Sequence, residues 1–557
     1  MSGKQKAGSH KGDKHAGRSQ VIAETALPLD PTGVPSLDLV LGGGLLRGSL
    51  TILVGPPGCG KTTLACQLAF AAARAGRRVL ILTAFSEPTS KLLAHLSVYS
   101  FFDPDLIGGP VRMLSVGQFL AHGLGAAAGE VVALAREGDA SLVVLDGFSG
   151  VRAADPDPIA ARQFLFDVGT ALSLQGATTI ITTEAEVRDP AAFPEATTAD
   201  TILGLYFSVQ DERQRRRLEV VKARGTGPLS GLHGLAISSA GIVISPRLEA
   251  RVMRADSESD PTSASGPAEP RDAAGRVTFA LPALDALLDG GLTRATTTVL
   301  LGSGGTGKTL LALQFALAGV RAGEPVVFLG FHEDQRQLQL KADTFDLGPE
   351  LRAALAPGGG LTLLHRPPIE LEADALADSL LASLDRTGAR RLVVDSIAEV
   401  ERAVSEGSGP RRVQNYLSAL VVALRARRIT AVLTRETGPL AGMELRLETD
   451  LSSAVAENVL WLQGVIYRER FYRVLSVLKM RFSPHDLTLR EFTIGAPAGI
   501  EVRAQRESER GVLAGIASQQ SDTWPSTFAT STIGGPARAR RGRSRPARAE
   551  QPSRDGT

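Results

Sequence analysis

Residues 50–70 read LTILVGPPGCGKTTLACQLAF, and residues 297–317 read TTVLLGSGGTGKTLLALQFAL. Both stretches contain the pattern G-x-x-x-x-G-K-[ST] between an apolar run and an Ala- and Leu-rich amphipathic run. This strand–loop–helix context is the one in which the pattern forms a phosphate-binding loop. The glycines let backbone N–H groups surround phosphate oxygens, and the helix N-terminus adds a favourable partial charge. A chance glycine-rich turn is a poor explanation for two such copies, so the sequence predicts two nucleoside triphosphate sites.

Each loop supplies a lysine that reaches the outer phosphates and a hydroxyl that binds Mg²⁺. The predicted nucleotide-binding residues are Gly55, Gly58, Gly60, Lys61, Thr62 and Thr63 in the first loop and Gly302, Gly305, Gly307, Lys308 and Thr309 in the second. Among these, Thr62 and Thr309 are the predicted metal-binding hydroxyls.

The composition is that of a globular protein, since 43% of the 557 residues are hydrophobic and 22% are charged. No apolar run approaches the roughly 20 residues that a membrane helix needs, and the N-terminal stretch is too polar for a secretion signal. The two cysteines, Cys59 and Cys66, suit a reducing compartment. We therefore expect a cytoplasmic protein without a membrane segment. Cys59 lies inside the first loop, where it is either a small tolerated residue or a redox-sensitive gate on nucleotide binding.

The internal repeat divides the chain into two large domains, although length alone would suggest roughly three or four of average size. We expect these domains at 29–250 and 277–502. The segment 251–276 is rich in Ser, Pro, Ala and acidic residues, which predicts a flexible linker. The tails, 1–28 and 503–557, lack an apolar pattern and are expected to be disordered.

The basic residues gather in the tails. The whole chain carries a net charge of +2, yet residues 1–20 carry +4 and residues 536–557 carry +5, which leaves −7 for the rest. The arginine-rich tail has the composition of a segment that touches nucleic acid, an acidic partner or a ring pore, or of one that is only solvated. The acidic core argues against nucleic-acid binding except through these tails.

Short β-branched runs alternate with helical patterns in both halves. The first half has expected strands at 50–55, 77–85, 111–116, 141–147 and 178–184, and expected helices at 61–75, 89–96, 119–136 and 158–174. The second half repeats the strands at 297–302, 325–331, 361–365, 391–396 and 429–436. This alternation predicts an α/β fold, with a mostly parallel, doubly wound sheet flanked by helices in each half. Val- and Leu-rich segments beyond these elements are expected to add antiparallel strands at one sheet edge.

An aspartate ends the same expected strand in each half, Asp146 in SLVVLDG and Asp395 in RLVVDS. A carboxylate at the carboxyl end of a buried strand, at nearly the same distance from each loop, is placed to support Mg²⁺. A single such aspartate would more simply be a turn residue or a helix cap. The duplication favours a metal role for Asp146 and Asp395.

Hydrolysis also needs a group that orients or deprotonates the attacking water. The candidates follow the second strand of each half, where Ser86-Glu87 matches His332-Glu333. In a doubly wound sheet this strand end faces the same crevice as the phosphates. We predict Glu87 and Glu333 as catalytic carboxylates, the alternative being acids that favour the first turn of a helix.

A third duplicated element pairs two cations, Lys222 with Arg224 and Lys479 with Arg481. Alternation along a strand puts the two cations on one face, where they repel each other unless an anion lies nearby. Because these strands are far from the chain's own loop, we expect them to reach the nucleotide of a neighbouring subunit, as arginine fingers do. An edge strand that is protected by charge is the alternative.

With both loops and both aspartates, the motifs TGVPSLDLVLGGGL, LPALDALLDGGL, VVKARGT and LKMRFSPHDLTLREF resemble those of the KaiC family over about residues 29–502. The resemblance implies tandem RecA-like ATPase domains in a homohexameric double ring, with ATP at subunit interfaces completed by the neighbour's Lys/Arg strand. It also implies ATP hydrolysis in the first ring and, in some members, Ser/Thr autophosphorylation in the second. Family themes are circadian timing and bacterial signalling, which makes an unidentified signalling protein an expected partner.

The chain departs from the family pattern at positions that matter for chemistry. KaiC-like proteins usually carry two adjacent glutamates after the second strand, and here the first is replaced by Ser86 and by His332. His332 is able to act as a base at neutral pH. The family's Ser-Thr phosphoacceptor pair aligns with Ser453 and an alanine, so Ser452 and Ser453 are the remaining candidate acceptors.

Four functions follow from these observations. The leading interpretation is a signalling ATPase that binds ATP and Mg²⁺. The second is a Ser/Thr autokinase, which the altered glutamate and acceptor positions weaken. The third is a RecA-related DNA-handling ATPase, for which only the basic tails argue. The fourth is a nucleotide-gated scaffold that binds ATP but hardly hydrolyses it.

Overall fold

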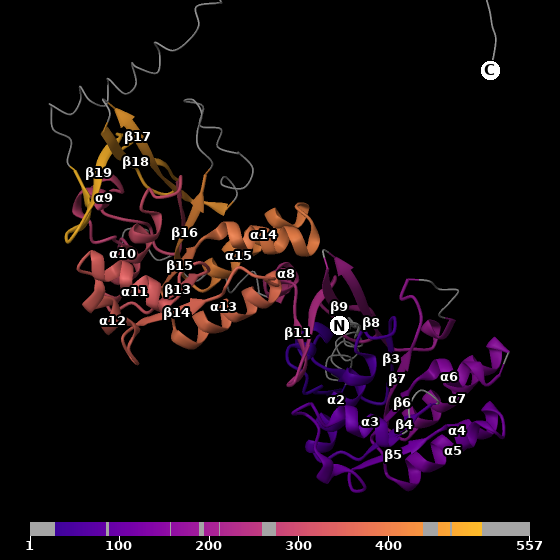
Figure 1. Ribbon diagram of the computed structural model, residues 1–557. Coiled ribbons are helices and arrows are strands. Elements are labelled where there is room, and N and C mark those ends of the chain that lie inside the picture. Colours follow the sequence, from indigo (N-terminus) through magenta and orange to yellow (C-terminus); the bar gives the residue numbers. More distant parts are fainter. Residues whose placement is uncertain are drawn as a thin grey trace, which may run out of the picture. The chain divides into compact units, whose positions relative to one another are not determined.

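The computed structural model describes residues 28–84, 89–155, 157–188, 194–210, 212–258, 275–437, 455–467 and 470–503. Each half forms a nine-stranded sheet with helices on both faces, and Figure 1 shows the two sheets with their labelled elements. The strand order is β11-β10-β9-β8-β3-β7-β6-β4-β5 in the first half and β14-β13-β15-β16-β12-β17-β18-β19-β20 in the second. Read from opposite ends, the two orders are the same, which confirms the predicted α/β fold and its duplication.

The loop strand lies among parallel neighbours in each sheet, as predicted for a doubly wound fold. The parallel strands of the first half are β3 (Leu50–Val54), β4 (Val79–Thr83), β5 (Val111–Ser115), β6 (Leu142–Asp146), β7 (Thr178–Thr183) and β8 (Thr201–Gln210). Those of the second half are β12 (Thr297–Gly302), β13 (Val326–Gly330), β14 (Leu361–His365), β15 (Arg391–Asp395), β16 (Thr430–Glu436) and β17 (Asn458–Tyr467).

Antiparallel strands extend one edge of each sheet, also as predicted. They are β9 (Arg213–Ala223), β10 (His233–Ser238) and β11 (Gly241–Ser245) in the first half, and β18 (Arg470–Met480), β19 (Arg490–Gly495) and β20 (Gly499–Val502) in the second. A small two-stranded sheet of β1 (Leu29–Asp30) and β2 (Leu45–Leu46) precedes the first loop.

Helices of the first half follow the predicted order with one break. They are α1 (Leu37–Leu41), α2 (Lys61–Arg74), α3 (Thr89–Leu96), α4 (Gly117–Leu120), α5 (Leu124–Glu137), α6 (Phe148–Ala153) and α7 (Pro158–Leu174), with 3₁₀ turns at Pro104–Leu106 and Pro194–Thr197. The helix expected over 119–136 is two helices, because Gly123 between α4 and α5 has a φ of 88°. Helix α8 (Leu248–Glu258) occupies the first residues of the segment predicted as a linker. Its leucine, alanine, arginine and methionine residues favour a helix.

The second half has α9 (Pro282–Leu287), α10 (Lys308–Arg321), α11 (Gln335–Thr344), α12 (Gly348–Leu355), α13 (Ala373–Thr387), α14 (Ile397–Ser408) and α15 (Arg411–Ala426). Asp334 caps α11 in a capping box with Gln337, and the Ser396 hydroxyl caps α14 by accepting a hydrogen bond from the N–H of Ala398. These caps fix where the two helices leave the sheet, at the strand ends that carry the predicted site.

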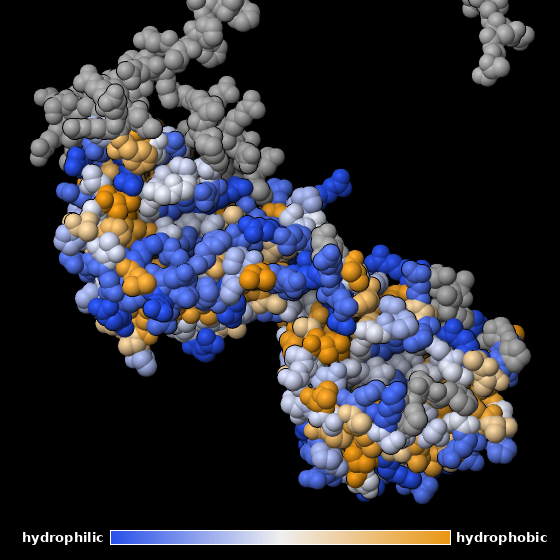
Figure 2. Space-filling model, viewed as in Figure 1, coloured by the Kyte–Doolittle hydropathy of each residue, from blue (hydrophilic) through white to orange (hydrophobic). Residues whose placement is uncertain are grey.

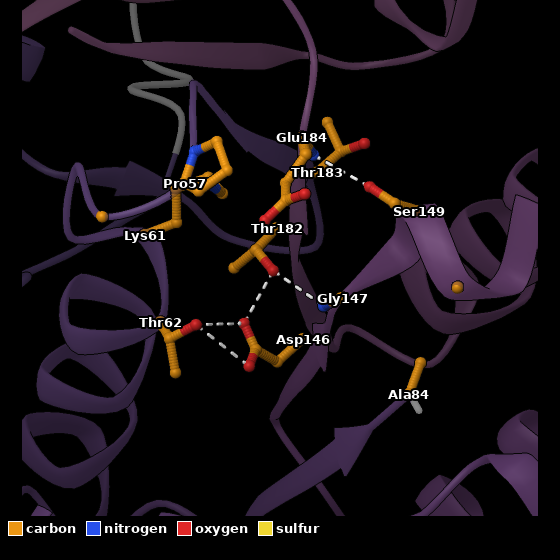
Figure 3. A pocket seen from close by; sticks show the side chains of 12 residues that line it. Pro57, Lys61, Thr62, Ala84, Asp146, Gly147, Ser149, Thr182, Thr183 and Glu184 are labelled. Atoms are coloured by element: carbon orange, nitrogen blue, oxygen red, sulfur yellow. Dashed lines mark hydrogen bonds between the residues drawn. The ribbon is translucent and has the colours of Figure 1, made fainter. Parts of the chain in front are cut away.

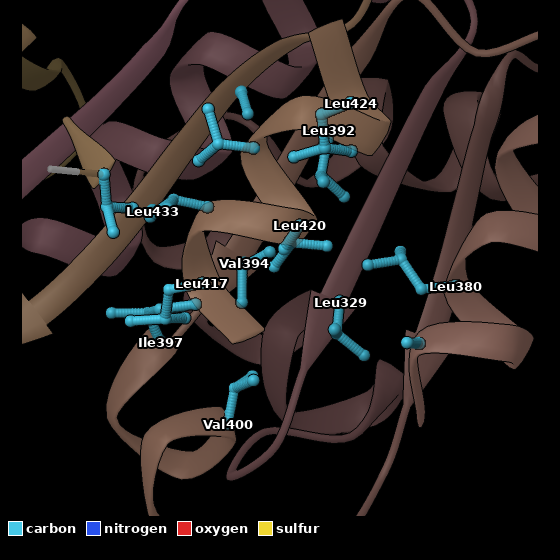
Figure 4. Packing of buried hydrophobic residues seen from close by; sticks show 14 of the residues in the cluster. Leu329, Leu380, Leu392, Val394, Ile397, Val400, Leu417, Leu420, Leu424 and Leu433 are labelled. Carbon is cyan, nitrogen blue, oxygen red and sulfur yellow. The ribbon is translucent and has the colours of Figure 1, made fainter. Parts of the chain in front are cut away.

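Apolar side chains fill both faces of each sheet. Figure 4 shows one such layer in the second half, where leucines of α13 and α15 pack on strands β13, β15 and β16. The strands that carry the predicted site residues at their ends are thus packed between apolar layers. The described residues include no helix that is long and apolar enough to cross a membrane. In Figure 2, the visible face of each half is mostly hydrophilic, with apolar residues scattered across it.

Candidate nucleotide-binding sites

The two loops have the same backbone conformation. Gly60 and Gly307, which precede α2 and α10, have φ values of 105° and 96°, a region that favours glycine. The first glycine of each loop is required for a different reason. A Cβ on Gly55 would lie 2.2 Å from the carbonyl oxygen of a β8 residue, and one on Gly302 would lie 2.5 Å from the equivalent oxygen on β17. The loop glycines are therefore fixed by the fold as well as by phosphate binding.

The loop lysines are held by carbonyl oxygens of their own loops. Lys61 Nζ donates to the carbonyls of Gly55 and Pro56, both at 2.9 Å. Lys308 Nζ donates to the equivalent carbonyls of Gly302 at 2.9 Å and Ser303 at 2.8 Å. Burial lowers the pKa of Lys308. An anion at this position would compensate the buried charge, as the phosphate-binding role of the motif requires.

Cys59 lies beside the first lysine, with its Sγ atom 3.8 Å from Lys61 Nζ. The thiol is buried, and burial raises its pKa. Because the thiolate is the reactive form, this environment favours a packing role over the redox gate considered from the sequence.

The strand-end aspartate of the first half accepts hydrogen bonds from two threonines (Figure 3). The Thr62 hydroxyl donates to Asp146, at 2.9 Å from Oδ1, and the Thr182 hydroxyl donates to Oδ1 at 2.6 Å. Thr182 also accepts a hydrogen bond from the N–H of Gly147 at 2.8 Å. With Lys61, these residues line one cavity of about 370 Å³. The structure thus brings the predicted loop residues and the predicted metal carboxylate together.

The second half repeats this arrangement in a cavity of about 630 Å³ that Lys308, Thr309 and Asp395 line together. The Thr434 hydroxyl on β16 donates to Asp395 Oδ1, as Thr182 on β7 does to Asp146. A hydroxyl, a carboxylate and nucleotide phosphates are the oxygen ligands that Mg²⁺ prefers. Within the described ranges, no three His, Cys, Asp or Glu side chains form a metal site. A metal here would therefore need phosphate or water oxygens besides the protein's.

The predicted catalytic glutamates have different outcomes. Glu87 lies outside the described residues, so its role stays a prediction. Glu333 lines the second cavity directly before α11, and its Oε1 forms an ion pair with Lys341 of that helix. Its other oxygen, Oε2, is buried without a hydrogen-bond partner among the described residues. His332 also lines this cavity and contacts Glu399.

The predicted cation pairs lie at the amino end of the loop strands. Thr201 pairs with Thr51 of β3 and with Ala223 of β9, so Lys222 and Arg224 are at the end of the sheet opposite the chain's own loop. Lys222 Nζ donates to the carbonyl of Ala196 at 3.1 Å.

The second half repeats this geometry with Lys479, whose Nζ donates to the carbonyl of Ala456 at 2.9 Å. Arg481 directly follows β18, as Arg224 follows β9. A β-bulge precedes each lysine in the strand register. Burial lowers the pKa of Lys222 and Lys479, and the adjacent arginine lowers it further. The candidate acceptors Ser452 and Ser453 lie outside the described residues.

Several cavity residues were not found from the sequence. They are Ser149, Thr182 and Glu184 in the first site and Lys341, Ser396, Glu399, Arg402, Thr434, Glu436 and Arg473 in the second. Thr182 and Thr434 occupy the same strand in the two halves, so the duplication itself was a usable signal. The positions that match Glu399 and Arg402 are Gly150 and Ala153 in the first half, so the duplication gave no signal for them and only the fold brings them to the cavity.

Two α/β domains in tandem, each with a phosphate-binding loop and a strand-end aspartate that line one cavity, define a tandem RecA-like P-loop ATPase. The sequence model of the family described as "ATPase: KaiC" matches residues 30–99, 122–249 and 277–507. The chain belongs to this KaiC ATPase family.

Curated relatives from this family are similar to the chain over most of its length. The circadian clock oscillator protein KaiC of Picosynechococcus sp. is 26% identical over 478 residues, covering 83% of this chain and 87% of the relative. That of Thermosynechococcus vestitus is 25% identical over 496 residues, with 87% and 91% covered. The circadian clock protein KaiC3 of Synechocystis sp. is 26% identical over 504 residues, with 87% and 93% covered.

Proposed function

We propose that this chain is a signalling ATPase that binds ATP with Mg²⁺ at both loops and hydrolyses it at the subunit interfaces of a homohexameric double ring. The observation that carries the proposal is the duplicated set of lysine, threonine and strand-end aspartate in each half. Lys61 and Lys308 would hold the outer phosphates, and Thr62 with Asp146 and Thr309 with Asp395 would support the metal. The metal supplies charge stabilisation at the transferred phosphoryl group.

The cation pairs support hydrolysis at interfaces. Lys222 and Arg224 lie at the far end of the sheet from their own loop, so a nucleotide that they contact has to belong to another subunit. Relatives named as circadian clock proteins KaiC support a signalling role for the nucleotide cycle. The partner of the proposed signalling assembly would then recognise a nucleotide-dependent conformation of the ring.

The test is to incubate purified protein with γ-labelled ATP and Mg²⁺ and to measure free phosphate and protein-bound label together. We expect phosphate release without stable label, and we expect Lys61→Ala and Lys308→Ala each to remove one class of ATP site. Phosphate release by the variant that carries both substitutions gives the baseline. Label that maps to Ser452 or Ser453 would instead show autokinase chemistry. Binding of ATP at two sites by the double variant would refute the loop assignments.

A further inference from the structure

The surviving glutamate of the second site is engaged by a neighbouring cation. Glu333 Oε1 forms an ion pair with Lys341, and both side chains are about one-third exposed. Accepting a proton would break this ion pair. The residue before it, His332, lies in the turn between β13 and α11 and lines the same cavity as Lys308 and Asp395.

A buried carboxylate holds one nitrogen of this histidine. His332 Nε2 lies 3.1 Å from Glu399 Oε1, and the same oxygen accepts a hydrogen bond from Arg402 Nη2 at 3.0 Å. The Glu399 side chain is 6% exposed, whereas that of His332 is 61% exposed. An ionised carboxylate only accepts hydrogen bonds, so Nε2 carries the proton and Nδ1 of a neutral imidazole is left as the acceptor.

The first half lacks both members of this pair. Its residue equivalent to His332 is Ser86, which precedes Glu87 as His332 precedes Glu333. Glu399 lies four residues after Asp395 in the sequence. The residue four positions after Asp146, at the matching place in the first half, is Gly150, which lines the first cavity. Histidine and glutamate therefore occur together at these two positions in the second half, and the first half has serine and glycine there. This joint occurrence favours a shared role over two unrelated substitutions.

We propose that His332 accepts the proton of the attacking water in the second site and that Glu399 is a positioning residue that fixes its tautomer. This proposal rests on the proposed ATPase function. In the step, the water proton moves to Nδ1 while the water oxygen bonds to the γ-phosphorus. The bond between that phosphorus and the β–γ bridging oxygen breaks, and its electron pair leaves with ADP. Glu399 stabilises the imidazolium, which then returns its proton to solvent.

The positioning role is tested without nucleotide or turnover. Solid-state ¹⁵N spectra of full-length protein labelled at its eight histidines report which nitrogen of each ring is protonated, and the spectrum of His332→Gln identifies the His332 signals. We expect the Nε2–H tautomer in the unaltered chain and a mixture in Glu399→Gln. The matched control is Glu406→Gln, the same change at an exposed position near the other end of α14. An Nδ1–H tautomer in the unaltered chain, or no change in Glu399→Gln, would overturn the role of Glu399.

The chemical role is tested by phosphate release in a Lys61→Ala background, in which only the second loop is intact. A general base contributes about 10²–10⁴-fold, so His332→Ala should lower release by at least about 100-fold. Glu399→Gln should lower it by at least about tenfold, because loss of the carboxylate that orients a catalytic histidine costs up to about 10⁴-fold. Glu399→Asp should recover part of this loss, and Glu406→Gln should not change release.

Circular dichroism of each variant establishes that it folds. Equal release by His332→Ala and its Lys61→Ala parent would overturn the proton-acceptor role alone and leave the ATPase proposal standing. Release by the parent no greater than by Lys61→Ala/Lys308→Ala would overturn ATP hydrolysis at the second site, and the role of His332 with it. The tautomer spectra would still decide whether Glu399 positions the ring.

Discussion

Replacing Thr182 by valine should loosen the first metal-supporting aspartate. Valine has nearly the same shape but removes two hydrogen bonds, the one donated to Asp146 Oδ1 at 2.6 Å and the one accepted from Gly147 N–H at 2.8 Å. A hydrogen bond to a charged group contributes about 1.5–3 kcal/mol and a neutral one about 1 kcal/mol. We therefore expect Thr182→Val to lower the free energy of unfolding of the first half by about 2.5–4 kcal/mol.

For a domain of this size, each kcal/mol shifts the melting temperature by about 2–4 °C. Thr182→Val should lower the first-half transition by on the order of 10 °C in calorimetry. The same variant should weaken Mg²⁺-dependent ATP binding at the first site in a Lys308→Ala background, because Asp146 loses the hydroxyl that orients it toward Thr62.

The matched control is Thr51→Val on the adjacent strand β3. Thr51 is fully buried, and its hydroxyl has no hydrogen-bond partner among the described residues. Removing an unsatisfied buried hydroxyl should leave stability unchanged or raise it. If Thr182→Val melted at the same temperature as Thr51→Val, the two hydrogen bonds would contribute nothing and the argument for Thr182 would be wrong.

Two further outcomes follow from the charges. Arg224→Ala and Arg481→Ala should each lower phosphate release and lower the fraction of hexamers seen by mass photometry. Each variant should still bind ATP at its own loops. Normal phosphate release by both variants would contradict the proposal that these arginines act on a neighbouring subunit's nucleotide. Because burial lowers the pKa of Lys308 and phosphate favours the protonated lysine, ATP affinity in the Lys61→Ala background should fall as the pH rises through that pKa. Calorimetry in buffers of different ionisation enthalpy should show proton uptake on binding there, and an affinity that stayed constant up to about pH 10 would contradict this.

The element order was predictable because it follows from local pattern. Short apolar runs rich in β-branched residues, such as 142–146, favour buried strands. A glycine-lysine loop of this pattern lies between a strand and a helix. The break at Gly123 was not predicted, since an Ala-rich run hides the effect of one glycine with a positive φ. The helix within residues 251–258 was missed because its serine and acidic residues were taken as linker composition.

The candidate sites were predictable only where the chain repeats itself. Lys61 and Asp146 recur as Lys308 and Asp395, and the structure places each pair in one cavity. Glu399 gave no such signal, because it lies on a helix with ordinary amphipathic spacing and the matching position in the first half is Gly150. The proposed role of Glu399 depends on its contact with His332, which lies 67 residues earlier in the chain, and only the fold brings the two side chains together.

The two halves have the same residue at positions where packing leaves no room for a side chain, and they differ at exposed positions around the cavity. Neither Gly55 nor Gly302 can carry a Cβ, because each lies against a carbonyl of the neighbouring strand. The first glycine of each loop therefore could not change without disturbing the sheet. His332 is largely exposed at the cavity, where a substitution costs little folding energy and changes the available chemistry. A difference in turnover between the two sites should thus arise from the residues around the phosphates rather than from the loops that bind them.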